Sequence, residues 1–166
     1  MKSTKLVVTV LGVVVALLAS RNAFAQGIEH YNLDDTKIAL HGYSPVSYFE
    51  EGHAEKGKRE FKSQHEGVSY YFTSAAQKKV FDKNPSKYIP AYGGWCAFGI
   101  TVGGLFRADP ENYKIVEGRL LVFLNDIEVD ARKLWDDTPN GDEVNTNKAK
   151  ANWTYFGKGQ WPHKGS

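Results

Sequence analysis

The chain has 166 residues, of which 42% are hydrophobic and 24% charged, and its formal net charge is +2. Without the three basic residues of the first 25, 18 basic residues stand against 19 acidic ones, a net charge of −1. This balance argues against a nucleic-acid partner, which needs a basic surface, and the length suits a single domain with its own core.

The first 25 residues are typical of an export signal. Two lysines precede an apolar run from Leu6 to Leu18, and Ala-Phe-Ala at 23–25 is a small-x-small cleavage site. A membrane-spanning helix needs roughly 20 apolar residues, which neither this run nor any later stretch supplies. We therefore predict a signal peptide over 1–25, cleavage near Ala25, a periplasmic or secreted protein, and no membrane span.

The first half of the mature chain predicts a hairpin after short elements. Residues 26–37 are polar and irregular, which indicates a flexible lead-in. A short strand is expected at Ile38–Leu40 and a short helix at Pro45–Glu51, because proline suits the first helical position. The strand-like runs Phe61–Gln64 and Val68–Phe72 are separated by a connection of hairpin length that contains glycine.

A helix should follow this hairpin. Ser74 and Gln77 form a capping box, the pattern in which two residues three positions apart satisfy the first amide groups of a helix. Asn84 and Pro85 end the helical pattern.

The centre of the chain is rich in glycine. Tyr92 to Gly104 holds the only cysteine, Cys96, and five of the sixteen glycines, and it has no charged side chain. Because glycine permits close backbone approach, we expect a buried loop here. A lone cysteine in an exported protein is a free thiol, an intermolecular bridge or a ligand.

The second half repeats the order of the first. Tyr113–Val116 and Arg119–Phe123, joined by Glu-Gly, predict a second hairpin. Asn125 and Glu128 form another capping box, and Pro139 ends the helix that they begin. The apolar stripe of this helix consists of Ile127, Ala131, Leu134 and Trp135.

The whole pattern predicts an α+β fold, an antiparallel sheet built from two hairpin-plus-helix units with an additional C-terminal helix at Asn140–Phe156. A hairpin alone is marginal in water, so the two units should share one sheet with both helices on one face. The alternative is that the match between the halves is chance, since this element order is common. The domain is expected over 38–156, with a tail at 157–166.

Three groups of residues have the spacing of a known family. They are His41 to Phe49, then Tyr71, Phe72, Ser74, Phe81, Asn84, Pro85 and Tyr88, and finally Tyr92 to Ala97. These groups resemble the exported branch of YHS-domain proteins, which implies a small sheet with helices. Related YHS modules look like metal-binding modules because of two cysteines four residues apart. The corresponding positions here are Thr73 and Gln77, so that pair of thiolates is absent.

Cys96 and His41 are the candidate metal ligands. A cysteine thiolate is a soft ligand for copper or zinc and also the nucleophilic form of the group, whereas the apolar neighbours of Cys96 equally suit a small buried hydrophobe. His41 would approach the glycine-rich loop as a second ligand or a base, or fix a turn by a backbone hydrogen bond. The mature chain has no methionine, so a copper site would depend on Cys96 and histidines.

Aromatic side chains are numerous enough to line a ligand pocket, and the candidates are Tyr43, Tyr48, Tyr92 and Trp95. The chain has no serine–histidine–acid pattern, phosphate loop or dinucleotide fingerprint, so no catalytic residue is assigned. We expect a non-enzymatic exported module that binds a metal ion, copper or zinc, or a small ligand near Cys96 and His41. The alternatives are a thiol-dependent redox protein or enzyme that uses Cys96, and a structural or partner-binding module with no ligand.

Overall fold

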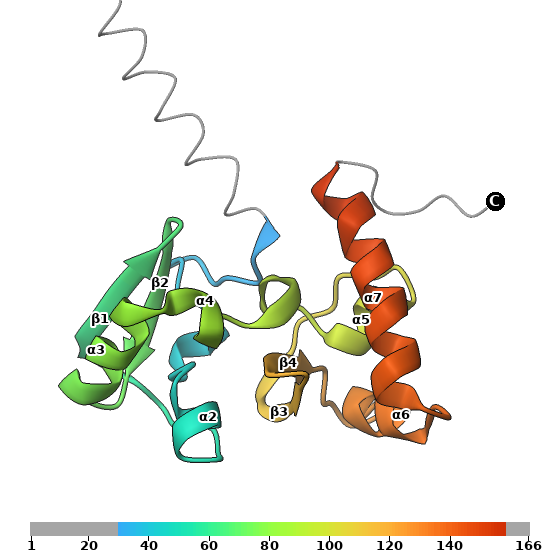
Figure 1. The fold of residues 1–166 in the computed structure, drawn as a ribbon, viewed down its shortest axis with the longest axis horizontal. Helices are drawn as coiled ribbons and strands as arrows, with labels where there is room; N and C mark the ends of the chain where they lie inside the picture. The colour runs from blue at the N-terminus through green and yellow to red at the C-terminus, as the bar shows by residue number, and fades with distance from the viewer. Residues whose placement is uncertain (1–29, 159–166) are drawn as a thin grey trace, which may run out of the picture.

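Two units of the same element order, followed by one long helix, make up the fold (Figure 1). The computed structural model describes residues 30–158, so the predicted signal peptide and the residues from 159 onward lie outside the described part. The first unit contains η2 (Leu40–Gly42), α2 (Ser47–Glu50), β1 (Lys58–His65), β2 (Val68–Phe72) and α3 (Ala75–Lys83). The connecting helix α4 (Pro85–Tyr88) leads to the second unit, which contains η3 (Ala91–Gly94), α5 (Ala97–Thr101), β3 (Asp109–Val116), β4 (Arg119–Phe123) and α6 (Ala131–Asp137), and α7 (Gly141–Gly157) follows. The predicted α+β class, with two hairpin-plus-helix units and a C-terminal helix, is confirmed.

The two hairpins have the same register. Lys58 pairs with Phe72 in the first, and Asp109 pairs with Phe123 in the second, a step of 51 positions for both partners (58 to 109, 72 to 123). The other four pairs differ by the same step, and both ladders have a bulge at the same place. Both turns have the sequence Glu-Gly with positive φ at each residue, the backbone that matches the twist of a tight hairpin.

The likeness of the units begins before the strands. In each unit, three consecutive residues of the first turn have φ between 49° and 83°: Leu40 to Gly42 in η2 and Tyr92 to Gly94 in η3. The amide of Ser44 then donates to the Glu55 carbonyl at 2.8 Å, and that of Cys96 to the Phe106 carbonyl at 2.9 Å. By this correspondence Cys96 takes the place of Ser44.

The hairpins form two separate two-stranded sheets, so the prediction that they share one sheet is wrong. The edges of β2 and β4 that lie outside the hairpin pairing each form a bridge with the segment that begins the same unit. Ile38 bridges Ser69 of β2, and Cys96 bridges Val122 of β4, both in parallel orientation. The strand expected at Ile38–Leu40 is reduced to such bridges, because the left-handed turn η2 begins at Leu40.

Of the two predicted capping boxes, the one before α3 forms and the one before α6 does not. Ser74 caps α3 as predicted, accepting from the amide of Gln77 at 3.3 Å. The capping box predicted at Asn125 is wrong, because Asp126 turns the chain there by accepting from two backbone amides. The helix α6 begins after Asp130, and Ile127 of the predicted stripe is fully exposed.

The glycine-rich centre and the lead-in also differ in detail from expectation. The segment from Tyr92 to Gly104 is buried over much of its length, but it contains η3 and α5 and is not a simple loop. The helix expected at Pro45–Glu51 forms only as α2. Residues 30–37 lie against η3, where the amide of Asn32 donates to the Gly93 carbonyl at 2.8 Å, so this part of the predicted lead-in is built into the fold.

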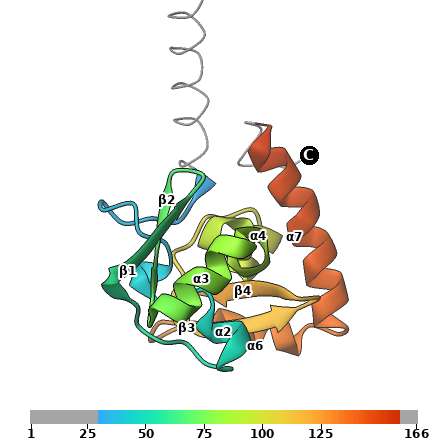
Figure 2. The same cartoon turned by 60° about the vertical axis from the view of Figure 1, so that its left-hand side comes forward.

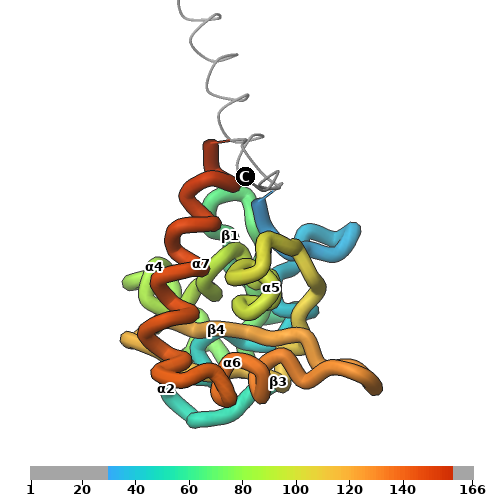
Figure 3. The backbone as a smooth tube through the Cα atoms, turned by 90° about the vertical axis from the view of Figure 1, so that its right-hand side faces the viewer, coloured from blue at the N-terminus to red at the C-terminus, as the bar shows by residue number. Residues whose placement is uncertain are grey.

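Aromatic pairs hold each helix on its hairpin. Phe81 of α3 packs on Phe72 with ring centres 5.0 Å apart, and Trp135 of α6 packs on Phe123 at 5.5 Å. Figure 2 shows α7 along the side of the molecule away from β1, and Figure 3 shows it beside α5 and α6. Between residues 30 and 158 no helix has the length and apolar composition that crossing a membrane requires.

Candidate functional site

Cys96 is a core residue in this structure. Its side chain is 1% exposed, and its Sγ accepts from the amide of Gly99 at 3.4 Å as the N-cap of α5. Burial raises the pKa of the thiol, while backbone hydrogen bonds oppose that shift. A thiol that stays protonated at neutral pH is the opposite of what the thiol-dependent alternative requires.

His41 lies at the middle of the left-handed turn η2, with φ 49°. Its carbonyl accepts from Nζ of Lys56 at 2.7 Å, and its side chain lines a cavity of about 290 Å³ that does not include Cys96. Among the residues that the structure describes, no three His, Cys, Asp or Glu side chains are grouped to hold a metal ion. Copper or zinc binding by Cys96 and His41 therefore stays a prediction.

Three of the predicted pocket aromatics use their polar groups within the fold. The hydroxyl of Tyr43 donates to Oε1 of Glu111 at 2.6 Å, and that of Tyr48 donates to the Pro110 carbonyl at 2.9 Å. Both bonds join the first unit to the second. Nε1 of Trp95 donates to the His30 carbonyl at 3.2 Å, which ties the lead-in to the second unit.

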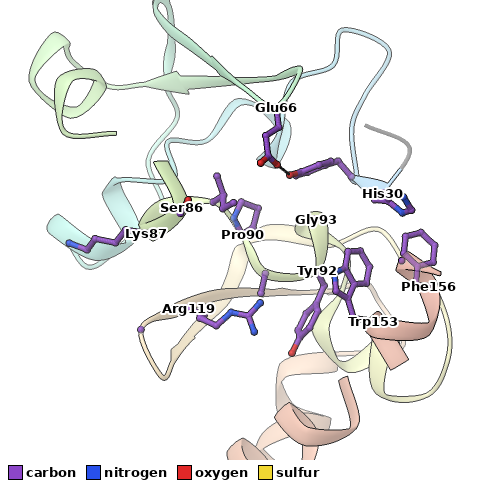
Figure 4. A pocket seen from close by; sticks show the side chains of 15 residues that line it. His30, Glu66, Ser86, Lys87, Pro90, Tyr92, Gly93, Arg119, Trp153 and Phe156 are labelled. Atoms are coloured by element: carbon purple, nitrogen blue, oxygen red, sulfur yellow. Dashed lines mark hydrogen bonds between the residues drawn. The ribbon is translucent and has the colours of Figure 1, made fainter. Parts of the chain in front are cut away.

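Tyr92, the fourth candidate, lines a cavity of about 520 Å³ between the two units and α7 (Figure 4). The turns of both hairpins reach this cavity: Glu66 lies on one side and Arg119 on the other, and Gly118 also lines it. The remaining lining comes from the lead-in, α4, η3 and the end of α7: His30, Tyr31, Ser86, Lys87, Ile89, Pro90, Ala91, Gly93, Trp153, Phe156 and Gly157.

The backbone at Tyr92 is held in an uncommon conformation. Tyr92 has φ 54° and ψ 35°, a left-handed conformation that costs a residue with a Cβ about 1–2 kcal/mol. Gly93, at φ 61°, packs so closely that a Cβ there would lie 2.2 Å from the His30 carbonyl oxygen. The lead-in and the glycine together fix the turn that presents the Tyr92 ring.

Four rings make a continuous aromatic wall. The ring centres of Tyr92 and Trp153 are 5.8 Å apart in an edge-to-face arrangement, and those of Trp153 and Phe156 are 4.8 Å apart and stacked. His30 meets the edge of Phe156, also at 4.8 Å. Because residues three apart on a helix are neighbours, α7 presents Trp153 and Phe156 together.

The polar groups of the cavity stand on opposite walls. On the wall of Tyr92, the guanidinium carbon of Arg119 lies 5.3 Å from the centre of the tyrosine ring. On the facing wall the Tyr31 hydroxyl donates to Oε2 of Glu66 at 3.0 Å. Burial and this carboxylate together raise the pKa of Tyr31 to about 12, so its hydroxyl stays protonated.

Among residues 30–158 the hydroxyl of Tyr92 makes no hydrogen bond of normal geometry, although the side chain is only 3% exposed, and its polar neighbour is the guanidinium of Arg119. Burial raises its pKa, and the nearby charge of Arg119 opposes the shift. A buried polar group without a partner is unfavourable and is a marker of a missing ligand or water. The cavity thus offers a protonated donor beside a cation and an aromatic surface.

Most of the residues that line this cavity carry no signal in the sequence. The sequence pattern indicates only a strand at Arg119 and gives no ligand-binding signal at Glu66. The one available signal is the three-residue spacing of Trp153 and Phe156 within the predicted C-terminal helix, which places them on one helical face. No local pattern joins residues that lie as far apart in the chain as Tyr31, Tyr92 and Trp153. In comparisons with known proteins, no family model, curated protein or solved structure matches the chain.

Proposed function

We propose that this chain is a non-enzymatic, exported, YHS-like domain that binds a small organic ligand in the cavity between its two units. A volume of about 520 Å³ falls within the usual range of small-molecule sites, about 300–1,000 Å³. One observation carries the proposal: Tyr92, whose buried hydroxyl makes no hydrogen bond of normal geometry, lines the same cavity as the aromatic wall of Trp153 and Phe156. Export rests on the sequence of the first 25 residues.

The proposal keeps the small-ligand form of the sequence prediction but centres it on Tyr92 in place of Cys96 and His41. The prediction that Cys96 and His41 bind a metal ion is tested separately, by titrating the wild type and Cys96→Ala with Cu(I) and Zn(II). Equal affinities would remove Cys96 from any metal site.

Binding of the neutral fluorescent probe N-phenyl-1-naphthylamine tests the proposal. The wild type should bind it with enhanced fluorescence, and Trp153→Ala should weaken binding about tenfold, because the ring supplies much of the apolar contact. Tyr155→Ala is the matched control, since Tyr155 lies on the same helix but does not line the cavity. No probe binding by the wild type, or equal binding by the wild type and Trp153→Ala, would contradict the proposal.

A further inference from the structure

The lining of the cavity includes a second cation besides Lys87, Arg119. Among residues 30–158, no carboxylate lies within ion-pair distance of Arg119. Its acidic neighbour Glu117 instead pairs with Lys150 at 3.0 Å. The other cation on the lining, Lys87, pairs with Glu50 at 3.2 Å, and Figure 4 shows its amine pointing away from Tyr92.

Building on the proposed function, we infer that the ligand is a small aromatic carboxylate, with its carboxylate on Arg119 and its ring on the wall formed by Trp153 and Phe156. An arginine fork suits a carboxylate because it donates two parallel hydrogen bonds. The guanidinium carbon lies 5.3 Å and the Trp153 ring centre 5.8 Å from the same Tyr92 ring centre. Arg119 and Trp153 thus both adjoin the Tyr92 ring, so one small molecule that carries a ring and a carboxylate can contact both.

The surroundings of Arg119 select the charge of the ligand. The Tyr92 hydroxyl is buried beside Arg119 without a hydrogen bond of normal geometry, so it can donate to an oxygen of a carboxylate that Arg119 holds. Glu66 stands on the facing wall with one oxygen bound by Tyr31. Its negative charge repels a second acidic group at that end of the ligand, so the site favours a monoanion over a dianion.

Three probes of similar shape separate charge from apolar contact: 2-naphthoate, the neutral 2-naphthamide and the cationic 2-naphthylmethylamine. Isothermal titration calorimetry should show 2-naphthoate binding to the wild type about tenfold more tightly than 2-naphthamide, since hydrogen bonds to a charged group are the stronger ones. The amine should bind most weakly. Added salt should weaken the binding of 2-naphthoate more than that of the amide.

The variants assign the preference to one residue. Arg119→Gln should bind 2-naphthoate and 2-naphthamide equally, whereas Lys87→Gln, the matched control, should keep the tenfold preference. Arg119→Lys keeps the charge but not the two parallel donors, so it should retain part of the preference for 2-naphthoate. Thermal melting verifies that each variant is folded.

Two results would overturn the inference and leave the proposed function standing. One is equal binding of 2-naphthoate and 2-naphthamide by the wild type, and the other is a preference for 2-naphthoate that survives in Arg119→Gln. Failure of both aromatic probes, and of the neutral fluorescent probe, would overturn the proposed function as well.

Discussion

Gly93 is the residue on which the shape of the cavity depends most directly. A methyl group there would meet the backbone of His30, while the φ of 61° disfavours any side chain. We expect Gly93→Ala to lower the free energy of unfolding by about 3 kcal/mol, measured by urea denaturation.

Gly52 provides the control for this substitution. It has φ +74°, and a Cβ there would have no atom within 4 Å, so Gly52→Ala should cost only about 1 kcal/mol for the backbone conformation. Equal losses for the two variants would show that contact with the lead-in does not constrain the turn.

Cys96 should behave as a protected thiol. Because burial raises its pKa, we expect the folded protein to react with Ellman's reagent at neutral pH far more slowly than the urea-unfolded chain. The raised pKa of Cys96 also predicts how the free energy of unfolding depends on pH. The folded state holds the thiol proton more tightly, so this stabilisation is present at neutral pH and is lost as the pH rises above about 8.5. Rapid reaction of the folded protein at neutral pH would restore the thiol-dependent alternative.

At the scale of elements, the start of α6 depends on Asp130. Its Oδ1 accepts from the amide of Arg132 at 3.0 Å, from that of Lys133 at 3.2 Å, and from Nδ2 of Asn112 at 2.9 Å. We expect Asp130→Ala to lower the free energy of unfolding by about 1–2 kcal/mol, the range typical of a lost N-cap.

Asn125→Ala tests the position that the sequence pattern favoured. Asn125 makes no cap contact, and its Nδ2 reaches only Oδ2 of Asp109 at 3.4 Å, so this variant should change stability by less than about 0.5 kcal/mol. A larger loss from Asn125→Ala than from Asp130→Ala would reverse the assignment.

The two capping boxes show why element starts are hard to predict from sequence. Ser74 has the Gln77 partner of a capping box three residues on, and it caps α3 as expected. Between residues 125 and 130, three short polar side chains compete for the same role, and the choice depends on where the buried Trp135 fits against Phe123. That contact spans the hairpin and the helix, so no local pattern contains it.

At the scale of the molecule, the α+β class and the two like units could be predicted because hairpins and helices carry local periodic signals. The separation of the two sheets could not, because the bridge of Cys96 to Val122 uses a glycine-rich segment without a strand pattern. The motif that suggested a site at Cys96 and His41 lies in the turns that start the two units. Of the predicted pocket residues, only Tyr92 lines the large cavity, which gathers side chains from almost the whole length of the domain.

The correspondence of the two units also exposes how they differ. At the position of Arg119 the first unit has Val68, which is fully buried, and at the position of Tyr92 it has Leu40. One copy therefore lacks both the charge and the aromatic ring that the other supplies. The proposed ligand site therefore uses side chains that only the second unit supplies at these two positions, and we expect one ligand per chain although the architecture is repeated.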